Sequence, residues 1–268
     1  MTTSPYSLED LVYLMQRLRE PETGCPWDLK QNYQSITSST IEEAYEVVDA
    51  IEQGDLDHLK EELGDLLFQV IFYSQLADEE KRFSFHDVVH VITEKLLRRH
   101  PHVFPDGTLQ SRRQPGEELD DSHIKASWEN IKQSERSAKG APGIFDDVPK
   151  ALPALTRAAK LQKRAAKLGF DWTATDQVLD KIEEELTELS EAFDAGSEED
   201  VAEELGDLMF TCVNLARHLG RDPDSLLRAA NQKFESRFTH VAARIKTASE
   251  QPPTAATLEA WWAEAKRR

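Results

Sequence analysis

The sequence predicts an all-α protein made of two tandem helical-bundle domains. No stretch alternates apolar and polar residues for long enough to indicate a β-strand, whereas apolar residues recur with helical spacing in both halves. In addition, the segment EELGDLLF at 61–68 returns as EELGDLMF at 203–210, an offset of 142 residues. Agreement over such a length indicates an internal duplication.

Helix signals divide the first half clearly. A stripe at 8–18 follows Ser7, which has the character of an N-cap with Asp10 three residues on. Thr40 and Glu43 resemble a second capping box, which is the structural alternative to a functional role for Glu43. The predicted helices of this half cover residues 8–18, 40–53, 57–81, 84–100 and 128–139.

The second half repeats this order. A helix is predicted at 153–168, and the helices of the acidic stretch 181–210 follow, the second capped by Ser197. Asp222 and Pro223 begin another helix, and the chain closes on a segment with two tryptophans. We therefore expect an N-terminal domain at 1–140, a linker at 141–150 and a C-terminal domain at 151–268.

Composition limits the functional classes. The formal charge of −18 argues against a duplex nucleic acid partner, because phosphate binding needs a basic face. Cys25 and Cys212 fall in different halves, so we expect buried free thiols and neither a disulfide framework nor a cysteine zinc site. No apolar run approaches 18 residues and no secretory signal opens the sequence. We expect a cytoplasmic protein with no membrane partner.

Paired acids carry the chemistry. On each of two helices the acids are three residues apart and so share a face, and the break at 194–197 predicts that the helices run antiparallel. Four carboxylates would then meet, and a divalent cation is the simplest relief of their repulsion. An all-oxygen site suits Mg²⁺ or Mn²⁺. The acids are Glu185, Glu188, Glu204 and Asp207, and the first half repeats them at Glu43, Glu46, Glu62 and Asp65.

Basic and aromatic residues also repeat. Lysine and arginine four residues apart occur at 95/99 and 233/237, and tryptophan with lysine occurs at 128/132 and 262/266. Taken singly, these pairs are typical of a solvated helix face and of core packing. Beside the carboxylates they indicate a polyphosphate site, in which an aromatic ring can stack on a base or ribose.

These motifs resemble the MazG family of nucleoside triphosphate pyrophosphohydrolases, whose pattern is ExxE, a spacer and ExxD. CPWD at 25–28, RRHPHVF at 98–104, GFDW at 169–172 and NLARHLG at 214–220 extend the resemblance over almost the whole chain. It implies a usually dimeric helical bundle that uses Mg²⁺ to hydrolyse NTPs or dNTPs to the monophosphate and pyrophosphate, as nucleotide-pool house-cleaning. Implied metal ligands are the four C-terminal acids, with the N-terminal four as a second site. Implied nucleotide contacts are Lys181, Glu184, Glu203, Lys233, Arg237, Trp262 and Lys266.

Catalytic roles are expected for Glu184, Glu185, Lys233 and Arg237. Glu184 would orient or deprotonate the attacking water, or else be a solvated surface acid. We favour the second half as catalytic, because Ser39 replaces Lys181 in the first. Seven residues before its ExxD aspartate the family can carry a lysine, where this chain has Asp200, and His58 in the first half. That departure puts one phosphate contact in question.

Three other protein classes compete with this interpretation. A di-iron bundle needs Glu-x-x-His, and none of the eight histidines lies three residues after a glutamate. A nucleotide-sensing protein, in which one or both domains only bind, stays open. So does a plain helical scaffold, whose stability would not respond to metal. For Trp27 and Trp172 we favour core packing over base stacking.

Overall fold

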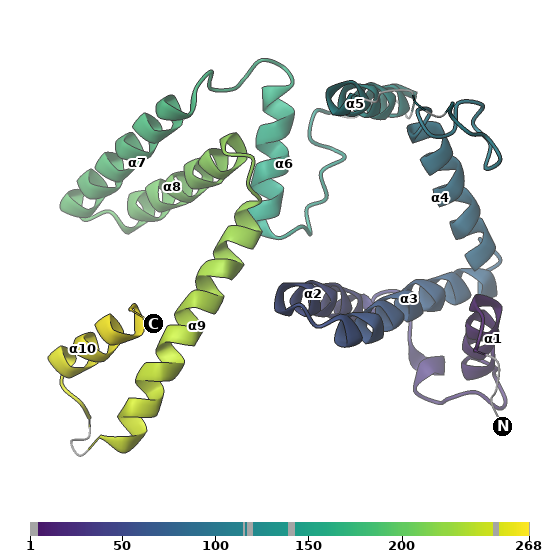
Figure 1. Cartoon of the computed structure of the whole chain (residues 1–268), viewed down its shortest axis with the longest axis horizontal. Helices are drawn as coiled ribbons and strands as arrows, with labels where there is room; N and C mark the ends of the chain where they lie inside the picture. The colour runs from purple at the N-terminus through teal and green to yellow at the C-terminus, as the bar shows by residue number, and fades with distance from the viewer. Residues whose placement is uncertain (1–4, 115, 117–119, 139–142, 249–251, 268) are drawn as a thin grey trace. The chain divides into compact units, whose positions relative to one another are not determined.

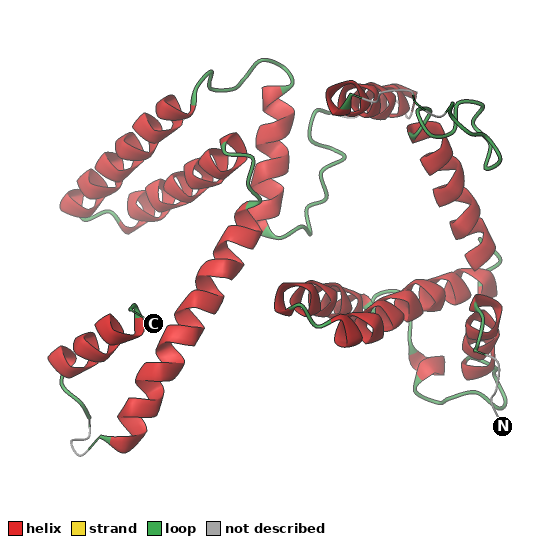
Figure 2. Cartoon of the chain, in the orientation of Figure 1, coloured by secondary structure: helices red, strands yellow, loops and turns green. Residues whose placement is uncertain are grey.

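The computed structural model describes residues 5–114, 116, 120–138, 143–248 and 252–267. Within these ranges the chain consists of helices and connecting loops without a strand (Figure 2), which confirms the all-α class. It divides into two compact units, Met1–Glu135 and Arg136–Arg268. The helices in the described ranges are all too short or too polar to cross a bilayer.

The N-terminal unit is built around a helical hairpin (Figure 1). Its helices α2 and α3 pack along each other and are joined at Gly54, whose φ of +73° lies in the left-handed region that favours glycine. α1 and α4 both pack against α3. The elements are α1 (Leu8–Leu18), η1 (Asp28–Lys30), α2 (Thr37–Gln53), α3 (Leu56–Glu79), α4 (Phe85–Arg99) and α5 (Asp121–Ala138).

Capping explains most of the helix starts in this unit. The Ser7 hydroxyl accepts from the Asp10 N–H at 3.2 Å, and the Asp10 carboxylate accepts from the Ser7 N–H at 2.8 Å, which is the predicted capping box. The capping box weighed as an alternative at Thr40 is not formed, because α2 already begins at Thr37. The Thr40 hydroxyl instead donates to the Ile36 carbonyl at 3.0 Å. Capping therefore does not account for Glu43.

The core of the N-terminal unit forms where α1 and the start of α2 meet α3. Arg19, at the end of α1, borders this core and is itself nearly buried. Its guanidinium lies 5.4 Å from the centre of the Phe72 ring and pairs with Glu79 at 2.7 Å. The buried apolar side chains are Met15, Ile36, Ile71, Phe72, Leu76 and Phe85. Each contributes about 2 kcal/mol to stability by leaving water.

The C-terminal unit repeats the hairpin. α7 and α8 pack closely and are joined at Gly196, whose φ is +74°, followed by Ser197 as the N-cap of α8. α6 packs against α8 and α9, and α10 packs against α9, which extends away from the hairpin in Figure 1. The elements are α6 (Ala154–Ala166), α7 (Thr175–Ala195), α8 (Glu198–His218), α9 (Pro223–Thr247) and α10 (Ala255–Ala265).

Candidate active site

The α7–α8 hairpin brings three of the predicted metal ligands together. Glu185 and Glu188 lie one helical turn apart on α7, and Glu204 lies opposite them on α8. One carboxylate oxygen from each lies within 4.8 Å of the other two. Glu185 is only 4% exposed, so its charge needs a counter-charge. A set of carboxylate oxygens at this spacing fits a hard divalent cation such as Mg²⁺ or Mn²⁺.

Asp207, the fourth predicted ligand, lies beside these three carboxylates. It is one turn after Glu204 on α8 and lines the same cleft as Glu185. Burial raises the pKa of Glu204, and the negative charges of Glu188, Glu185 and Asp207 raise it further. The sequence predicted a metal ion because these carboxylates would repel one another. The raised pKa of Glu204 indicates that such repulsion acts between these side chains.

Lys181 supplies positive charge to the same cluster. Its ammonium nitrogen lies 2.8 Å from Glu184 Oε1, 3.0 Å from Glu185 Oε1 and 3.9 Å from Glu188 Oε2. Hydrogen bonds to Glu184 and then to Glu185 raise the pKa of Lys181 above its ordinary value, so it is charged at neutral pH. Glu184 itself is exposed at the rim of the cluster. Lys181 thus occupies the position of a counter-ion among the acids.

The N-terminal hairpin builds a second cluster of the same kind. Carboxylate oxygens of Glu43, Glu46 and Glu62 lie within 4.8 Å of one another, and Glu62 is buried. Burial raises the pKa of Glu43, and the charges of Asp65 and Glu46 add to the effect. Here His58 contacts Glu62, its Nε2 lying 2.7 Å from Glu62 Oε1. The two clusters therefore have carboxylates at equivalent positions. They differ in the neighbouring side chain, which is His58 in the N-terminal cluster and Lys181 in the C-terminal one.

The predicted phosphate-binding cations gather elsewhere in the C-terminal unit. Lys233 and Arg237 on α9 and Lys266, which follows α10, line a cavity of about 370 Å³ between these helices. The Trp262 ring lies 5.8 Å from the Lys266 ammonium and 5.5 Å from the centre of the Phe234 ring. The cavity is separate from the cleft that contains Glu185 and Asp207. Within one chain, Lys233, Arg237 and Lys266 are therefore separate from the acids, whereas Lys181 lies among them.

A cleft of about 710 Å³ opens beside the acid cluster, and most of its lining has no role predicted from the sequence. Gln162 of α6 and Asn214 of α8 lie in its wall together with residues of the 169–172 loop. The Asp171 carboxylate holds this loop to α8 by accepting from Arg217 at 2.9 Å. Asp171 and Asn214 belong to the GFDW and NLARHLG motifs, which were a usable signal, whereas Gln162 stood in no motif.

Two expectations about single side chains need correction. Trp172 is 41% exposed and lines the cleft, and Trp27 is more exposed still, so core packing is wrong for both rings. Both tryptophans lie in loops, within CPWD at 25–28 and GFDW at 169–172, and outside the α-helices. Both cysteines are free, as expected, but Cys25 is only partly buried and Cys212 is exposed.

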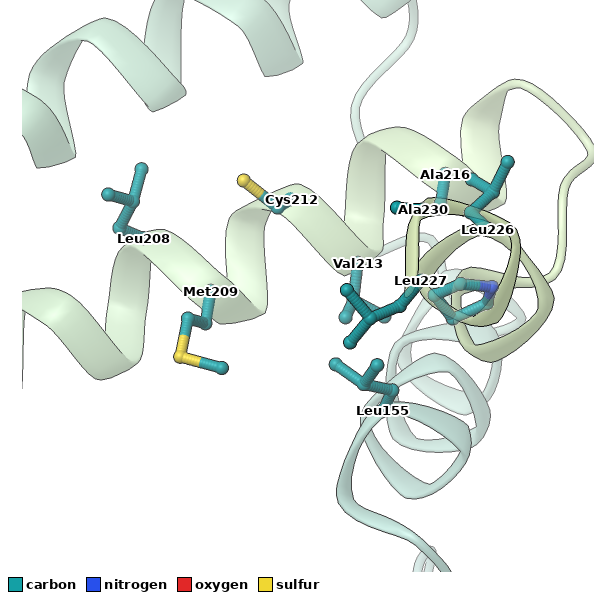
Figure 3. Close-up of a pocket in the computed structure, with 10 residues that line it drawn as sticks. Leu155, Leu208, Met209, Cys212, Val213, Ala216, Leu226, Leu227 and Ala230 are labelled. Atoms are coloured by element: carbon teal, nitrogen blue, oxygen red, sulfur yellow. The ribbon is translucent and has the colours of Figure 1, made fainter. Parts of the chain in front are cut away.

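Cys212 lines a second pocket, which is almost wholly apolar and measures about 420 Å³ (Figure 3). It lies where α6, α8 and α9 meet. Met209, Leu226 and Leu227 line it and are each about half exposed. Large apolar side chains left open to water in this way are typical of a surface that binds a partner.

Comparisons with known proteins agree with this geometry. A family model described as MazG nucleotide pyrophosphohydrolase domain matches residues 31–104, and one described as phosphoribosyl-ATP pyrophosphohydrolase matches residues 153–234. The nucleoside triphosphate pyrophosphohydrolase of Escherichia coli (strain K12) is 47% identical over 266 residues, 97% of each chain. A Thermotoga maritima protein named nucleoside triphosphate pyrophosphohydrolase/pyrophosphatase MazG is 45% identical over 230 residues, 86% of this chain and 83% of its own.

The fold and the paired carboxylate clusters, together with these relatives, define an all-α nucleotide pyrophosphohydrolase. The chain is thus an enzyme that acts on the phosphoanhydride bonds of nucleotides. More narrowly, it belongs to the MazG family of nucleoside triphosphate pyrophosphohydrolases. The resemblance carried by the ExxE and ExxD motifs is confirmed.

Proposed function

We propose that the C-terminal unit hydrolyses nucleoside triphosphates to the monophosphate and pyrophosphate with Mg²⁺, or Mn²⁺ in its place. The observation that carries the proposal is the close approach of carboxylate oxygens from Glu185, Glu188 and Glu204. Asp207 completes the ligand set from the next turn of α8. The role we infer is removal of unwanted nucleotides from the cytoplasmic pool, where such substrates occur.

The bound cation would neutralise charge on the phosphoryl oxygens and make the attacking water more acidic. Glu184, which is exposed and whose Oε1 lies 2.8 Å from the Lys181 ammonium, would accept a proton from that water. Lys233 and Arg237, with Lys266, donate hydrogen bonds to phosphate oxygens as their charge grows. Trp262 stacks on the ribose, and Glu203 contacts the substrate at the rim.

The two groups of residues must meet for this reaction, and we propose that a homodimer brings them together. The half-exposed apolar pocket of Figure 3 supports such an interface, because a lone copy would leave it wet. The cations between α9 and α10 of one subunit would then serve the acids of its partner. No contact with duplex nucleic acid is proposed, given the charge of −18.

For the N-terminal unit we propose nucleotide or metal binding without turnover. Its carboxylates repeat those of the C-terminal unit, but Ser39 stands where Lys181 would reach the phosphates. His58 stands in place of Asp200 and pairs with Glu62 at 2.7 Å. Loss of the lysine removes a charge that the reaction needs.

Paired substitutions in the full chain test both assignments. Glu185→Gln should lower Mg²⁺-dependent release of pyrophosphate from ATP by about a hundredfold or more, because it removes a buried ligand. Glu62→Gln, which removes the buried carboxylate of the N-terminal cluster, should leave the rate within about twofold of wild type. Pyrophosphate release would be followed while Mg²⁺ is varied. Unchanged release in Glu185→Gln would contradict the metal assignment, and a large loss in Glu62→Gln would contradict the division of labour.

A further inference from the structure

We propose that the cleft beside the C-terminal acid cluster is the nucleobase pocket and that the Gln162 carbonyl oxygen selects bases with an amino group. The inference rests on the proposed function, since it assumes that the acids mark the phosphate end of a nucleotide. Lys181, Glu185 and Asp207 line the cleft. Gln162 and exposed aromatic rings line it as well.

The orientation of the Gln162 amide follows from its one hydrogen bond. Its Nε2 donates to the Phe210 carbonyl oxygen at 2.8 Å, and because a carbonyl can only accept, the nitrogen must be on that side. The remaining atom, Oε1, is buried and has no hydrogen-bond partner among the described residues. Gln162 is only 7% exposed and lines the cleft. A buried acceptor without a donor is unfavourable unless a ligand supplies one.

The cleft has the size and lining of a site for a flat ring. Its volume of about 710 Å³ lies within the range usual for small-molecule sites. Phe170 and Trp172 of the 169–172 loop and Phe145 provide aromatic surface, and all three are substantially exposed. Exposed rings beside a buried acceptor suit a base, which stacks by its faces and donates by its edge.

The internal duplication shows that this cleft differs from its counterpart. At the offset of 142 residues, Asn214 corresponds to Phe72 and His218 to Leu76. Phe72 is 1% exposed and Leu76 is also buried, so both fill the core of the N-terminal unit. Asn214 instead lines the cleft. The C-terminal copy has therefore kept polar groups and open volume where the other copy packs apolar side chains.

A lone acceptor discriminates between bases by chemistry. The 6-amino group of adenine and the 4-amino group of cytosine donate hydrogen bonds, whereas hypoxanthine and uracil carry a carbonyl at the same positions. A carbonyl facing Gln162 Oε1 would place two acceptors together and leave both without a donor. We expect kcat/KM to be about tenfold higher for ATP than for ITP, and for CTP than for UTP.

The experiment measures kcat/KM for these four nucleotides with the full chain and Mg²⁺. Gln162→Leu should reduce both ratios to about one. Gln69→Leu is the matched control, because Gln69 is buried in the N-terminal unit and its Oε1 likewise has no partner among the described residues. That variant should keep the wild-type ratios. Ratios near one in wild type, or ratios unchanged in Gln162→Leu, would overturn the inference.

A binding measurement separates this inference from the proposed function. Calorimetric titration of the wild-type protein with AMP and IMP needs no turnover and no folded variant. AMP should bind about tenfold more tightly than IMP, and equal affinities would overturn the base-pocket assignment. Absence of hydrolysis for all four triphosphates, with AMP still preferred, would contradict only the proposed function.

Discussion

Lys181 contacts carboxylates that are proposed to bind the metal ion, and it is also proposed to contact the phosphates of the substrate. Its ammonium is within 3.9 Å of oxygens of Glu184, Glu185 and Glu188, two of which are proposed metal ligands. The same carboxylates cannot fully satisfy both the ammonium and a divalent ion. Binding of metal should therefore release Lys181 from the acids and free it for phosphate.

Replacement of this lysine tests that competition. Lys181→Met should raise the affinity for Mg²⁺ in the absence of nucleotide by about fivefold, because it removes a competing ion pair. The same variant should lose turnover, since a phosphate contact goes with it. Calorimetric titration with Mg²⁺ gives the affinity, and Lys160→Met, on an exposed face of α6, controls for net charge. Weaker or unchanged Mg²⁺ binding in Lys181→Met would exclude the competition.

At this scale the sequence predicts acids better than it predicts neutral groups. Glu185, Glu188 and Glu204 could be found because carboxylates that recur at helical spacing in both halves indicate a shared cation site. Gln162 could not, because its unpaired oxygen depends on a hydrogen bond to Phe210, which lies on another helix. Such a property belongs to the packing of α6 on α8 and leaves no pattern along the chain.

At the level of elements, capping residues and glycines predicted most helix ends. Ser7, Ser84, Ser197 and Asp222 are all N-caps whose side chains accept from the backbone. The start of α2 was missed because the run SITSST offers several hydroxyl caps, while the actual N-cap is Ile36, which has no side-chain acceptor. The start of α5 at Asp121 was missed because its first turn is polar.

The loop that carries Phe170 and Trp172 depends on one carboxylate. Hydrogen bonds from Arg217, joined by His218, lower the pKa of Asp171 from 3.8 to about 2. Because the folded-state pKa is depressed, the stabilisation is present above the unfolded value near 3.8 and is lost as pH falls toward 2. Asp171 therefore ties the 169–172 loop to α8 throughout the physiological range.

Asp171→Asn should lower the free energy of unfolding by about 1 kcal/mol at pH 7, since solvent screens this partly exposed pair. The deficit should shrink as pH falls from 4 to 2, as urea denaturation at several pH values would show. KM for ATP should also rise, because the loop lines the cleft. Glu135→Gln is the matched control for KM. Arg99 and Arg98 likewise lower the pKa of Glu135 to about 2, but Glu135 lies in the N-terminal unit, so this variant should leave KM for ATP unchanged. A deficit that grows on acidification would contradict the assignment.

On the scale of the whole molecule, the proposed homodimer is what would bring the acids of one subunit to the cations of the other. Leu226→Glu places a charge in the apolar pocket of Figure 3 and should convert a dimer to a monomer of 30.5 kDa. Light scattering after size exclusion measures the mass. Leu109→Glu, a change at an exposed leucine in the N-terminal unit, should leave the dimer intact. A wild-type protein of monomeric mass would rule the interface out.

Mixed subunits test whether the site is shared. Glu185→Gln and Lys233→Ala should each be inactive alone, because each removes one group that every site needs. In a re-equilibrated mixture, half of the dimers contain both variants and one intact site, so activity should return to about a quarter of wild type. A mixture as inactive as its components would place the acids and the cations of one site in the same chain.

Duplication and helical class could be predicted from the sequence, because repeated motifs and periodicity are properties of the chain itself. The separation of Lys233, Arg237 and Lys266 from the acids could not, since it depends on the direction in which α9 leaves α8. The apolar pocket of Figure 3 could not be predicted either. Its position requires the packing of α6, α8 and α9.

Both hairpins turn at a left-handed glycine, Gly54 in one and Gly196 in the other. In both, the acids lie at the same distances along the chain from this glycine. The hairpin backbone that brings the acids together is thus present in both copies. The basic side chains beside the acids differ, with His58 in one copy and Lys181 in the other. One substitution at Ser39 or Lys181 would add or remove a positive charge beside one acid cluster without altering the scaffold. Under the proposed division of labour, the N-terminal copy can accept substitutions around its acids while the C-terminal copy keeps turnover.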